Sequence, residues 1–222
     1  YTEANTRFLL VNDNWRGLVI DGDSSHIRHI RKDDISWRHD LTAVRAFVSK
    51  ENINAILTNH GFTGEIGLLS IDIDGNDYWI WECISVARPS IVVVEYNSYF
   101  GAVRAVSIPY DPAFYRITAH YSGLYWGCSL KALVLLAEKK GYAFVGCNSG
   151  GNNAYFVRSD RLGSLKRTTA AKGYVESKFR ESRDRRGKLT YLSGNDRLAL
   201  IKDMPVVDVE TNTTIRIREI MQ

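Results

Sequence analysis

The fold is decided by the stretch Ile66-Gly67-Leu68-Leu69-Ser70-Ile71-Asp72-Ile73-Asp74-Gly75-Asn76-Asp77, in which a short uncharged run leads into three carboxylates. A run that is apolar on both faces is typical of a parallel strand covered by helices on each side. Acids that directly follow such a strand lie at its carboxyl end, where open α/β sheets bind their ligands. The sequence therefore predicts an α/β fold with a ligand site after this strand.

On either side of this stretch, similar apolar runs recur, and segments with helical periodicity lie between them. We expect strands at 17–21, 43–48, 66–72, 91–95, 142–146 and 154–158, and helices at 3–12, 52–59, 76–85 and between Ser129 and Gly141. This alternation predicts a doubly wound, mostly parallel sheet with right-handed crossovers. Only seven residues separate the last two strands, which is too few for a parallel crossover. These two strands are therefore expected to form an antiparallel hairpin that ends the sheet.

The composition is that of an ordinary globular protein, since the 222 residues are 45% hydrophobic and 24% charged with a formal net charge of +4. Disordered and fibrous classes are thereby excluded. No run reaches the roughly 18–20 apolar residues of a membrane-spanning helix. Three widely spaced cysteines without a CxxC pair favour a reducing compartment over a disulfide framework or a structural zinc site. We therefore expect a cytoplasmic protein without a membrane span.

The positive charge is concentrated towards the C-terminus. Residues 161–188 contain ten basic and three acidic side chains, and this segment is expected to be a long surface excursion that is partly helical around 173–183. We expect an α/β domain at 1–160 and a basic extension at 161–222 that packs partly on it. The basic segment 161–188 is a candidate for binding nucleic-acid phosphates, an acidic polysaccharide or a nucleotide-linked sugar. The competing interpretation is a solvated surface, which is the commonest role of such runs.

Further polar residues follow neighbouring strands at the same edge of the predicted sheet. Asp21 and Asp23 follow the first strand, and Glu95 and Asn97 follow the strand at 91–95. Acids gathered at one rim repel one another unless a cation or a hydroxyl-rich ligand binds among them. A divalent cation is therefore one expected occupant, with the candidate ligands Asp72, Asp77 and Glu95. The alternative for Asp77 is capping of the helix that follows.

The long connection at 96–126 is rich in aromatic residues and is expected to lie over this rim. Aromatic faces with hydroxyl groups suit a sugar or another polyol. The candidate substrate-binding residues are Tyr96, Asn97, Tyr99 and Tyr110. His120 is a candidate general base. The competing interpretation is that these aromatic side chains form a small core under a long loop and that the histidine is structural.

The four residues Asp72-Ile73-Asp74-Gly75 resemble the DxDG motif of haloacid-dehalogenase-type phosphatases. In that resemblance Asp72 attacks phosphorus and Asp74 acts as the acid and base. Two features differ from that family. Asn76 and Asp77 stand where Thr and Leu normally follow, and the motif comes after at least two strands instead of opening the domain.

A second resemblance covers about residues 5–160. The block Ile71–Asp77, followed by Pro89–Glu95, resembles the I-D-[VI]-[ED]-G-x-[ED] block and next strand of FkbM-like methyltransferases. Trp15–Asp23 is similar to the second strand of that family with its acidic end. Gly146–Arg158 is similar to the antiparallel strand pair that ends class I S-adenosylmethionine-dependent folds. The resemblance implies a Rossmann-like methyltransferase fold.

The resemblance also implies S-adenosylmethionine as cofactor and a sugar, glycan or other hydroxylated small molecule as acceptor. The implied cofactor-binding residues are Asp21, Gly22 and Asp23 at the ribose, Phe47 at the adenine and Asp72 at the methionine end. The acceptor pocket would be lined by Glu95 and Asn97. The implied candidates for a base that takes the acceptor proton are Asp72, Asp74, Glu95 and His120.

One departure from the family pattern concerns the first strand and its glycine-rich loop, which precede the helix expected at 3–12. The sequence begins at Tyr1, so we expect this first strand to be missing from the given chain through truncation. The alternative is a degenerate, catalytically silent relative that binds a polyanion through its basic segment.

Overall fold

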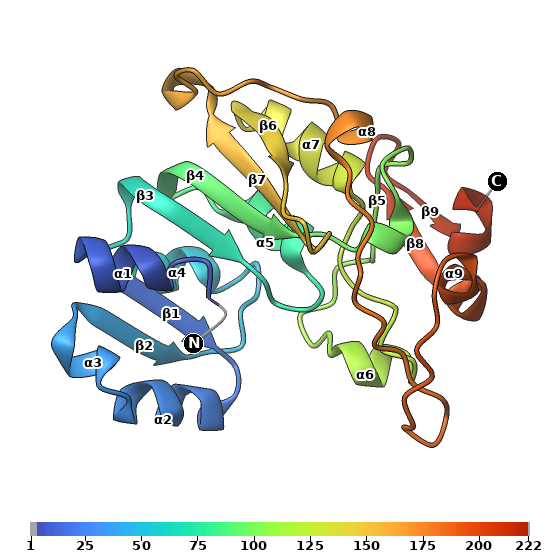
Figure 1. Ribbon diagram of the computed structural model, residues 1–222, viewed down its shortest axis with the longest axis horizontal. Helices are drawn as coiled ribbons and strands as arrows, with labels where there is room; N and C mark the ends of the chain where they lie inside the picture. The colour runs from blue at the N-terminus through green and yellow to red at the C-terminus, as the bar shows by residue number, and fades with distance from the viewer. Residues whose placement is uncertain (1–3, 222) are drawn as a thin grey trace.

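The computed structural model describes residues 4–221 and has a mixed α/β architecture (Figure 1). All six expected strands form, although several begin or end a few residues away from the expected bounds. One parallel pair consists of β1 (Gly17–Asp21) and β2 (Leu41–Arg45). A four-stranded sheet contains, in spatial order, β3 (Gly64–Ile71), β4 (Ala87–Glu95), β7 (Asn153–Arg158) and β6 (Tyr142–Cys147).

The register of the four-stranded sheet brings the polar strand ends together. β3 and β4 are parallel, with Ile71 opposite Val94, so Asp72 and Glu95 come next on neighbouring strands. β7 is antiparallel to β4, with Asn153 opposite Glu95. β6 and β7 pair antiparallel, which confirms the hairpin expected at this end of the sheet.

The parallel pair β1–β2 is not hydrogen-bonded to the four-stranded sheet, whereas a single sheet was expected. The helix α1 (Arg7–Asp13) and the residues around it connect the two. Asn5 Nδ2 donates to Ser70 Oγ of β3 at 3.1 Å. The Trp15 ring packs so closely on Gly67 that a Cβ there would lie 2.2 Å from it. Glu3, the expected first residue of this helix, lies outside the described residues.

The main core packs helices against the four-stranded sheet. These helices are α4 (Ile53–Asn59), α5 (Asp77–Cys83) and α7 (Leu130–Lys139). Trp81 of α5 stacks on Phe156 of β7 with ring centroids 4.8 Å apart. Ser129 caps α7 as expected, because its hydroxyl accepts from Ala132 N at 3.2 Å. Burial of such large aromatic side chains is the main source of stability here.

A second core lies between the connection at 96–126 and the C-terminal residues. It joins Phe100, Val106, Ile108, Leu124 and Tyr125 to Ile201, Val206 and Ile217. Three antiparallel strands accompany it, which are β5 (Val106–Ser107), β8 (Pro205–Asp208) and β9 (Thr213–Arg216), next to α9 (Asn195–Ile201). Several aromatic side chains of the long connection are therefore core residues.

The helix expected at 173–183 does not form, and that prediction was wrong. Only α8 (Ala170–Gly173) is helical, and the chain then runs in an irregular conformation to residue 183. Tertiary hydrogen bonds hold it there, since the Tyr174 hydroxyl donates to Ser98 O at 2.9 Å and Ser177 N donates to Ser98 Oγ at 3.0 Å. These bonds outweigh the weak local helical preference.

The remaining elements are short. They comprise α2 (Ser24–Lys32), α3 (Ile35–Arg38), α6 (Arg116–Ala119) and the 3₁₀ turns Ser98–Phe100, Ser159–Arg161 and Ile217–Ile220. Figure 1 shows α2 and α3 beside the β1–β2 pair, at the edge opposite β6. Within residues 4–221, no helix has both the length and the apolar character needed to cross a membrane.

Candidate functional site

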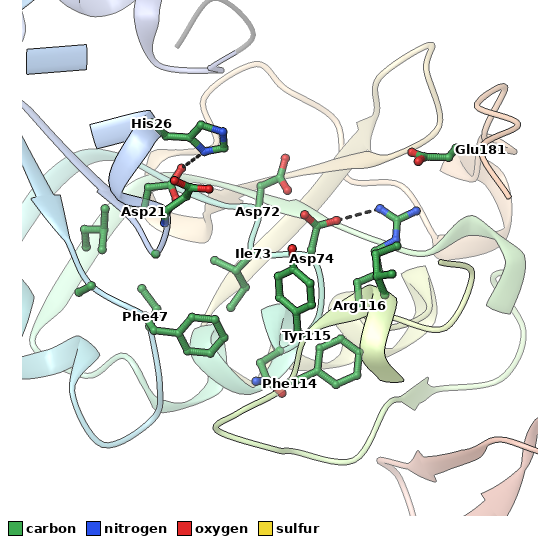
Figure 2. A pocket seen from close by; sticks show the side chains of 17 residues that line it. Asp21, His26, Phe47, Asp72, Ile73, Asp74, Phe114, Tyr115, Arg116 and Glu181 are labelled. Atoms are coloured by element: carbon green, nitrogen blue, oxygen red, sulfur yellow. Dashed lines mark hydrogen bonds and ion pairs between the residues drawn. The ribbon is translucent and has the colours of Figure 1, made fainter. Parts of the chain in front are cut away.

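A cavity of about 570 Å³ opens at the carboxyl ends of β1 and β3 (Figure 2). It gathers six of the site residues expected from the sequence, which are Asp21, Gly22, Asp23, Phe47, Asp72 and Asp74. These side chains come from three separate segments of the chain. The volume lies in the range that is typical of small-molecule and cofactor sites.

The turn after β1 presents Asp21 to the cavity. Its Oδ1 accepts from Asp23 N at 2.7 Å, and its Oδ2 lies 3.0 Å from His26 Nδ1. Asp23 caps α2 by accepting from Ser25 N and Ser25 Oγ, both at 2.6 Å, and these bonds lower the pKa of Asp23 below its ordinary value. Asp21 is therefore oriented from two sides while part of its carboxylate remains exposed.

Apolar side chains form the cavity walls. Phe47 is 52% exposed, Tyr115 is 61% exposed and Ile117 is 43% exposed, which are high values for residues of these types. Phe47 packs closely over Gly22, where a Cβ would lie 3.1 Å from the ring. Exposed apolar faces inside a concave site are expected to be covered by a bound ligand.

The loop after β3 is held from inside by Asp77. This side chain is fully buried and accepts from Ile73 N at 2.9 Å and from Gly75 N at 3.0 Å. Burial, and then the charge of Asp72, raise the pKa of Asp77 to about 7. Asp74 has a left-handed backbone with φ of 57°, a conformation that is uncommon outside glycine. The loop is thus a fixed turn that projects Asp72 and Asp74 into the cavity.

Arg116 of α6 fixes the position of Asp74. Its Nη1 donates to Asp74 Oδ1 at 2.8 Å, and its Nε donates to Gly123 O at 2.6 Å. The guanidinium also lies 5.0 Å from the ring centroid of Trp126. Figure 2 shows the Asp74–Arg116 pair at one side of the cavity, with Asp72 between it and Asp21.

Asp72, which lines the cavity, forms a carboxyl pair with Glu95, which is buried behind it. Glu95 is 9% exposed, and burial followed by the charge of Asp72 raises its pKa well above the ordinary value. The pKa of Asp72 is also raised, because the concave site partly excludes water and Asp74 adds negative charge, although a hydrogen bond with Glu95 opposes the shift. Burial and mutual repulsion therefore raise the pKa of both carboxyl groups of this pair.

Three buried polar atoms near this pair have no hydrogen-bond partner within residues 4–221. They are Glu95 Oε2, Asn153 Oδ1 and Trp126 Nε1. For the expected divalent cation, the described part of the chain contains no group of three or more His, Cys, Asp or Glu side chains arranged to hold a metal ion. The carboxylate of Asp77, one of the candidate ligands, is occupied by backbone N–H groups.

The expected substrate-binding residues do not line the cavity. The Tyr96 hydroxyl donates to Val175 O at 2.6 Å, and the buried Asn97 amide donates to Leu124 O and Trp126 O. The Tyr110 hydroxyl donates to Glu51 Oε2 at 2.7 Å. These side chains hold loops together in this structure.

Two further candidates also lie apart from the cavity lining. The Tyr99 ring packs under Arg197, whose guanidinium lies 4.5 Å from the ring centroid. His120 Nδ1 lies 2.7 Å from Ser122 Oγ, and burial, followed by the charge of Arg185, lowers the pKa of His120. A histidine in this environment is neutral at pH 7 and contacts a structural hydroxyl.

Several lining residues were not anticipated from the sequence. They are His26, Ile73, Phe114, Tyr115, Arg116, Ile117 and Glu181. Phe114 and Tyr115 belong to the aromatic connection at 96–126. This segment therefore reaches the site, but through residues other than the expected substrate-binding residues. Glu181 comes from the C-terminal extension, and no local pattern marks it.

Comparison with protein-family models, with curated proteins and with solved structures finds no match to this chain. The cavity combines the hydrogen-bond-accepting carboxylate of Asp21 at one end, exposed apolar faces at the side and, between Asp21 and the Asp74–Arg116 pair, the carboxylate of Asp72 with its raised pKa. Such a site can bind a ligand with vicinal hydroxyls and a flat ring, and can accept a proton beside it.

Proposed function

We propose that the chain is an S-adenosylmethionine-dependent methyltransferase of Rossmann-like fold that methylates a hydroxyl of a sugar or similar acceptor. One observation carries the proposal. The residues that the FkbM-like resemblance assigns to the cofactor, Asp21, Gly22, Asp23, Phe47 and Asp72, line one cavity although they come from three segments.

The residues of the cavity fit the chemical groups of this cofactor. Asp21 is oriented to accept hydrogen bonds from two neighbouring ribose hydroxyls. Phe47 offers an exposed aromatic face of the kind that packs on an adenine ring. The acidic character around Asp72 and Asp74 suits the positive charge of a sulfonium group. When bound, S-adenosylmethionine supplies an electrophilic methyl group.

Asp72 is the best-placed base for the acceptor. It faces the cavity, and its raised pKa makes it a stronger base than an ordinary carboxylate. Asp74 is paired with Arg116, so its role is to shape the site and to orient a hydroxyl of the acceptor. Alignment of the reacting groups accounts for much of the rate enhancement in transfers of this kind.

The order of the strands also supports the proposed fold. β2 and β1 form one parallel pair, and β3, β4, β7 and β6 follow as a separate sheet. The proposed Rossmann-like sheet has one further parallel strand between β1 and β3. The carboxyl end of this further strand would lie between Asp21 and Asp72.

Titration calorimetry of the full-length protein with S-adenosylmethionine tests the proposal. We expect binding that is weakened at least about tenfold by Asp21→Ala, since a hydrogen-bonded carboxylate contributes on the order of 1.5–3 kcal/mol. Asp40→Ala is the matched control, because Asp40 is exposed at the amino end of β2. Absence of binding, or equal loss in both variants, contradicts the proposal. Magnesium-dependent phosphomonoester hydrolysis lost in Asp72→Asn would instead favour the phosphatase.

A further inference from the structure

A second cavity, of about 470 Å³, is lined by three arginines of the C-terminal extension together with polar and apolar side chains. Its lining consists of Tyr121, Arg183, Asp184, Arg185, Arg186, Thr190, Leu192 and Leu200. The proposed methyl transfer does not use these residues. We infer that this cavity is a binding site for an oxyanion, a phosphate or sulfate group, carried by the acceptor.

The cavity is built on an ordered hairpin, defined here as the basic hairpin, residues 182–192. Thr190 N donates to Ser182 O at 2.8 Å, and Leu192 N donates to Ser182 Oγ at 2.9 Å. Asp184 closes the tip, since its Oδ1 accepts from Arg186 N at 2.8 Å and from Lys188 N at 2.9 Å. The basic side chains therefore project from a fixed backbone.

The charges of the basic hairpin are only partly neutralised. Arg183 pairs with Glu181 at 2.8 Å, and the carboxylate of Asp184 is turned towards the backbone. The side chains of Arg186 and Lys188 have no hydrogen-bond or ion-pair partner in the described part of the chain. Clustered cations of one sign repel one another, and an oxyanion that accepts from several of them relieves this repulsion.

Arg185 adds a directional element. Its guanidinium lies 4.8 Å from the ring centroid of Tyr121. Stacking on an aromatic face fixes the guanidinium plane and leaves its N–H groups free at the edge, which is the arrangement suited to bidentate contacts with phosphate. Leu192 and Leu200 supply an apolar floor beside it.

The two cavities are neighbours. Glu181 lines the first cavity, and its ion-pair partner Arg183 lines the second. Arg183 N also donates to Ser122 O at 3.1 Å, so the hairpin is attached to the segment that follows α6. Figure 1 shows the tip of this hairpin beside α6, whose Arg116 and Ile117 line the first cavity. One acceptor can therefore place a hydroxyl near Asp72 and an anionic group at the basic hairpin.

The distribution of charge favours an acceptor with a separate anionic group. The first cavity carries Asp21, Asp23, Asp72, Asp74 and Glu181, and these acids repel an oxyanion. The basic hairpin attracts it to one side of the transfer site. The assignment of the oxyanion to an acceptor rests on the proposed function, whereas the binding of an oxyanion does not.

Calorimetry with inorganic pyrophosphate tests the site directly. We expect the double variant Arg185→Ala/Arg186→Ala to weaken pyrophosphate binding by about tenfold or more, since two charge-assisted contacts are lost. The matched control is Lys166→Ala/Arg167→Ala, which removes two exposed cations of the same basic segment outside the hairpin. We expect this control to bind like the unaltered protein.

Three results would overturn the inference. The first is that the unaltered protein does not bind pyrophosphate. The second is that both double variants weaken pyrophosphate binding equally. The third is that a single-stranded oligonucleotide binds more tightly than pyrophosphate and that its binding depends equally on both pairs of cations. If a hexose phosphate displaces pyrophosphate and the parent hexose does not, the result supports an oxyanion that is part of the acceptor. S-adenosylmethionine binding, measured separately on the same samples, reports on the proposed function, so failure of either idea is recognised independently.

Discussion

The contact between Gly75 and Phe114 is the most direct link between the sequence motif and the shape of the cavity. A Cβ on Gly75 would lie 2.3 Å from Cδ1 and 2.6 Å from Cε1 of the Phe114 ring. Both separations are far below van der Waals contact, so Gly75→Ala must displace the ring. Phe114 lines the cavity and packs on Tyr125, with centroids 6.2 Å apart, so the ring has little room to move.

Insertion of a methyl group into such a packed contact costs typically 1–3 kcal/mol, and we expect about 2 kcal/mol for Gly75→Ala. In a Phe114→Ala background the obstructing ring is absent, and the same substitution should cost close to zero. The expected coupling energy is therefore about 2 kcal/mol. Urea unfolding of the two single variants, the double variant and the unaltered protein measures it.

A cost for Gly75→Ala that is the same in both backgrounds would refute this reasoning. It would mean that the glycine is needed for its backbone and not for the approach of Phe114. S-adenosylmethionine affinity provides a second readout. We expect Gly75→Ala to weaken binding, because the displaced ring forms part of the cavity wall.

Three further predictions follow from the site. Asp77→Ala removes the carboxylate that accepts hydrogen bonds from Ile73 N and Gly75 N. We expect this variant to lower the free energy of unfolding by about 2 kcal/mol, as measured by urea titration. An unchanged free energy of unfolding contradicts the role of Asp77 in holding the loop. Burial raises the pKa of Glu95 well above 4.5 in the folded state. Above pH 4.5 the folded chain therefore binds more protons than the unfolded chain, and the free energy of unfolding falls as the pH rises. Glu95→Gln should flatten this fall above pH 4.5, and an unaltered slope argues against a raised pKa of Glu95. Phe47→Ala should leave the urea midpoint of unfolding nearly unchanged, because the Phe47 side chain is 52% exposed. The same substitution should weaken S-adenosylmethionine binding about tenfold, as measured by calorimetry. An affinity equal to that of the unaltered protein contradicts a contact between Phe47 and the adenine.

The elements that the sequence predicted well are those with strong local signals. β3 and β4 are short runs of Ile, Val and Leu, and α7 has a capping serine and an apolar stripe. The hairpin of β6 and β7 followed from the length of its connection. In each case neighbouring residues carry the information, so the pattern alone is sufficient.

The elements that the sequence missed depend on distant partners. β5 is two residues long and exists because it pairs with β8, about a hundred positions further along the chain. The segment at 173–183 is held in an irregular conformation by hydrogen bonds to Ser98 instead of forming a helix. The separation of β1 from β3 likewise has no local signal.

The candidate site was predicted in part for a related reason. Strand-end position predicted that Asp21, Asp72 and Asp74 lie at one rim, because parallel strands end there, and all three line the cavity. Residue type does not indicate where a side chain points. Asn97 and Tyr110 have suitable chemistry for a substrate, but their polar groups bind the protein itself.

The proposed function requires that the cavity between β1 and β3 binds S-adenosylmethionine. A crystal structure of the full-length protein with S-adenosylhomocysteine tests it most directly. We expect the ribose hydroxyls on the Asp21 carboxylate, the adenine against Phe47 and the homocysteine end directed towards Asp72. A ligand bound outside this cavity, or a saturated crystal with the cavity empty, would contradict it.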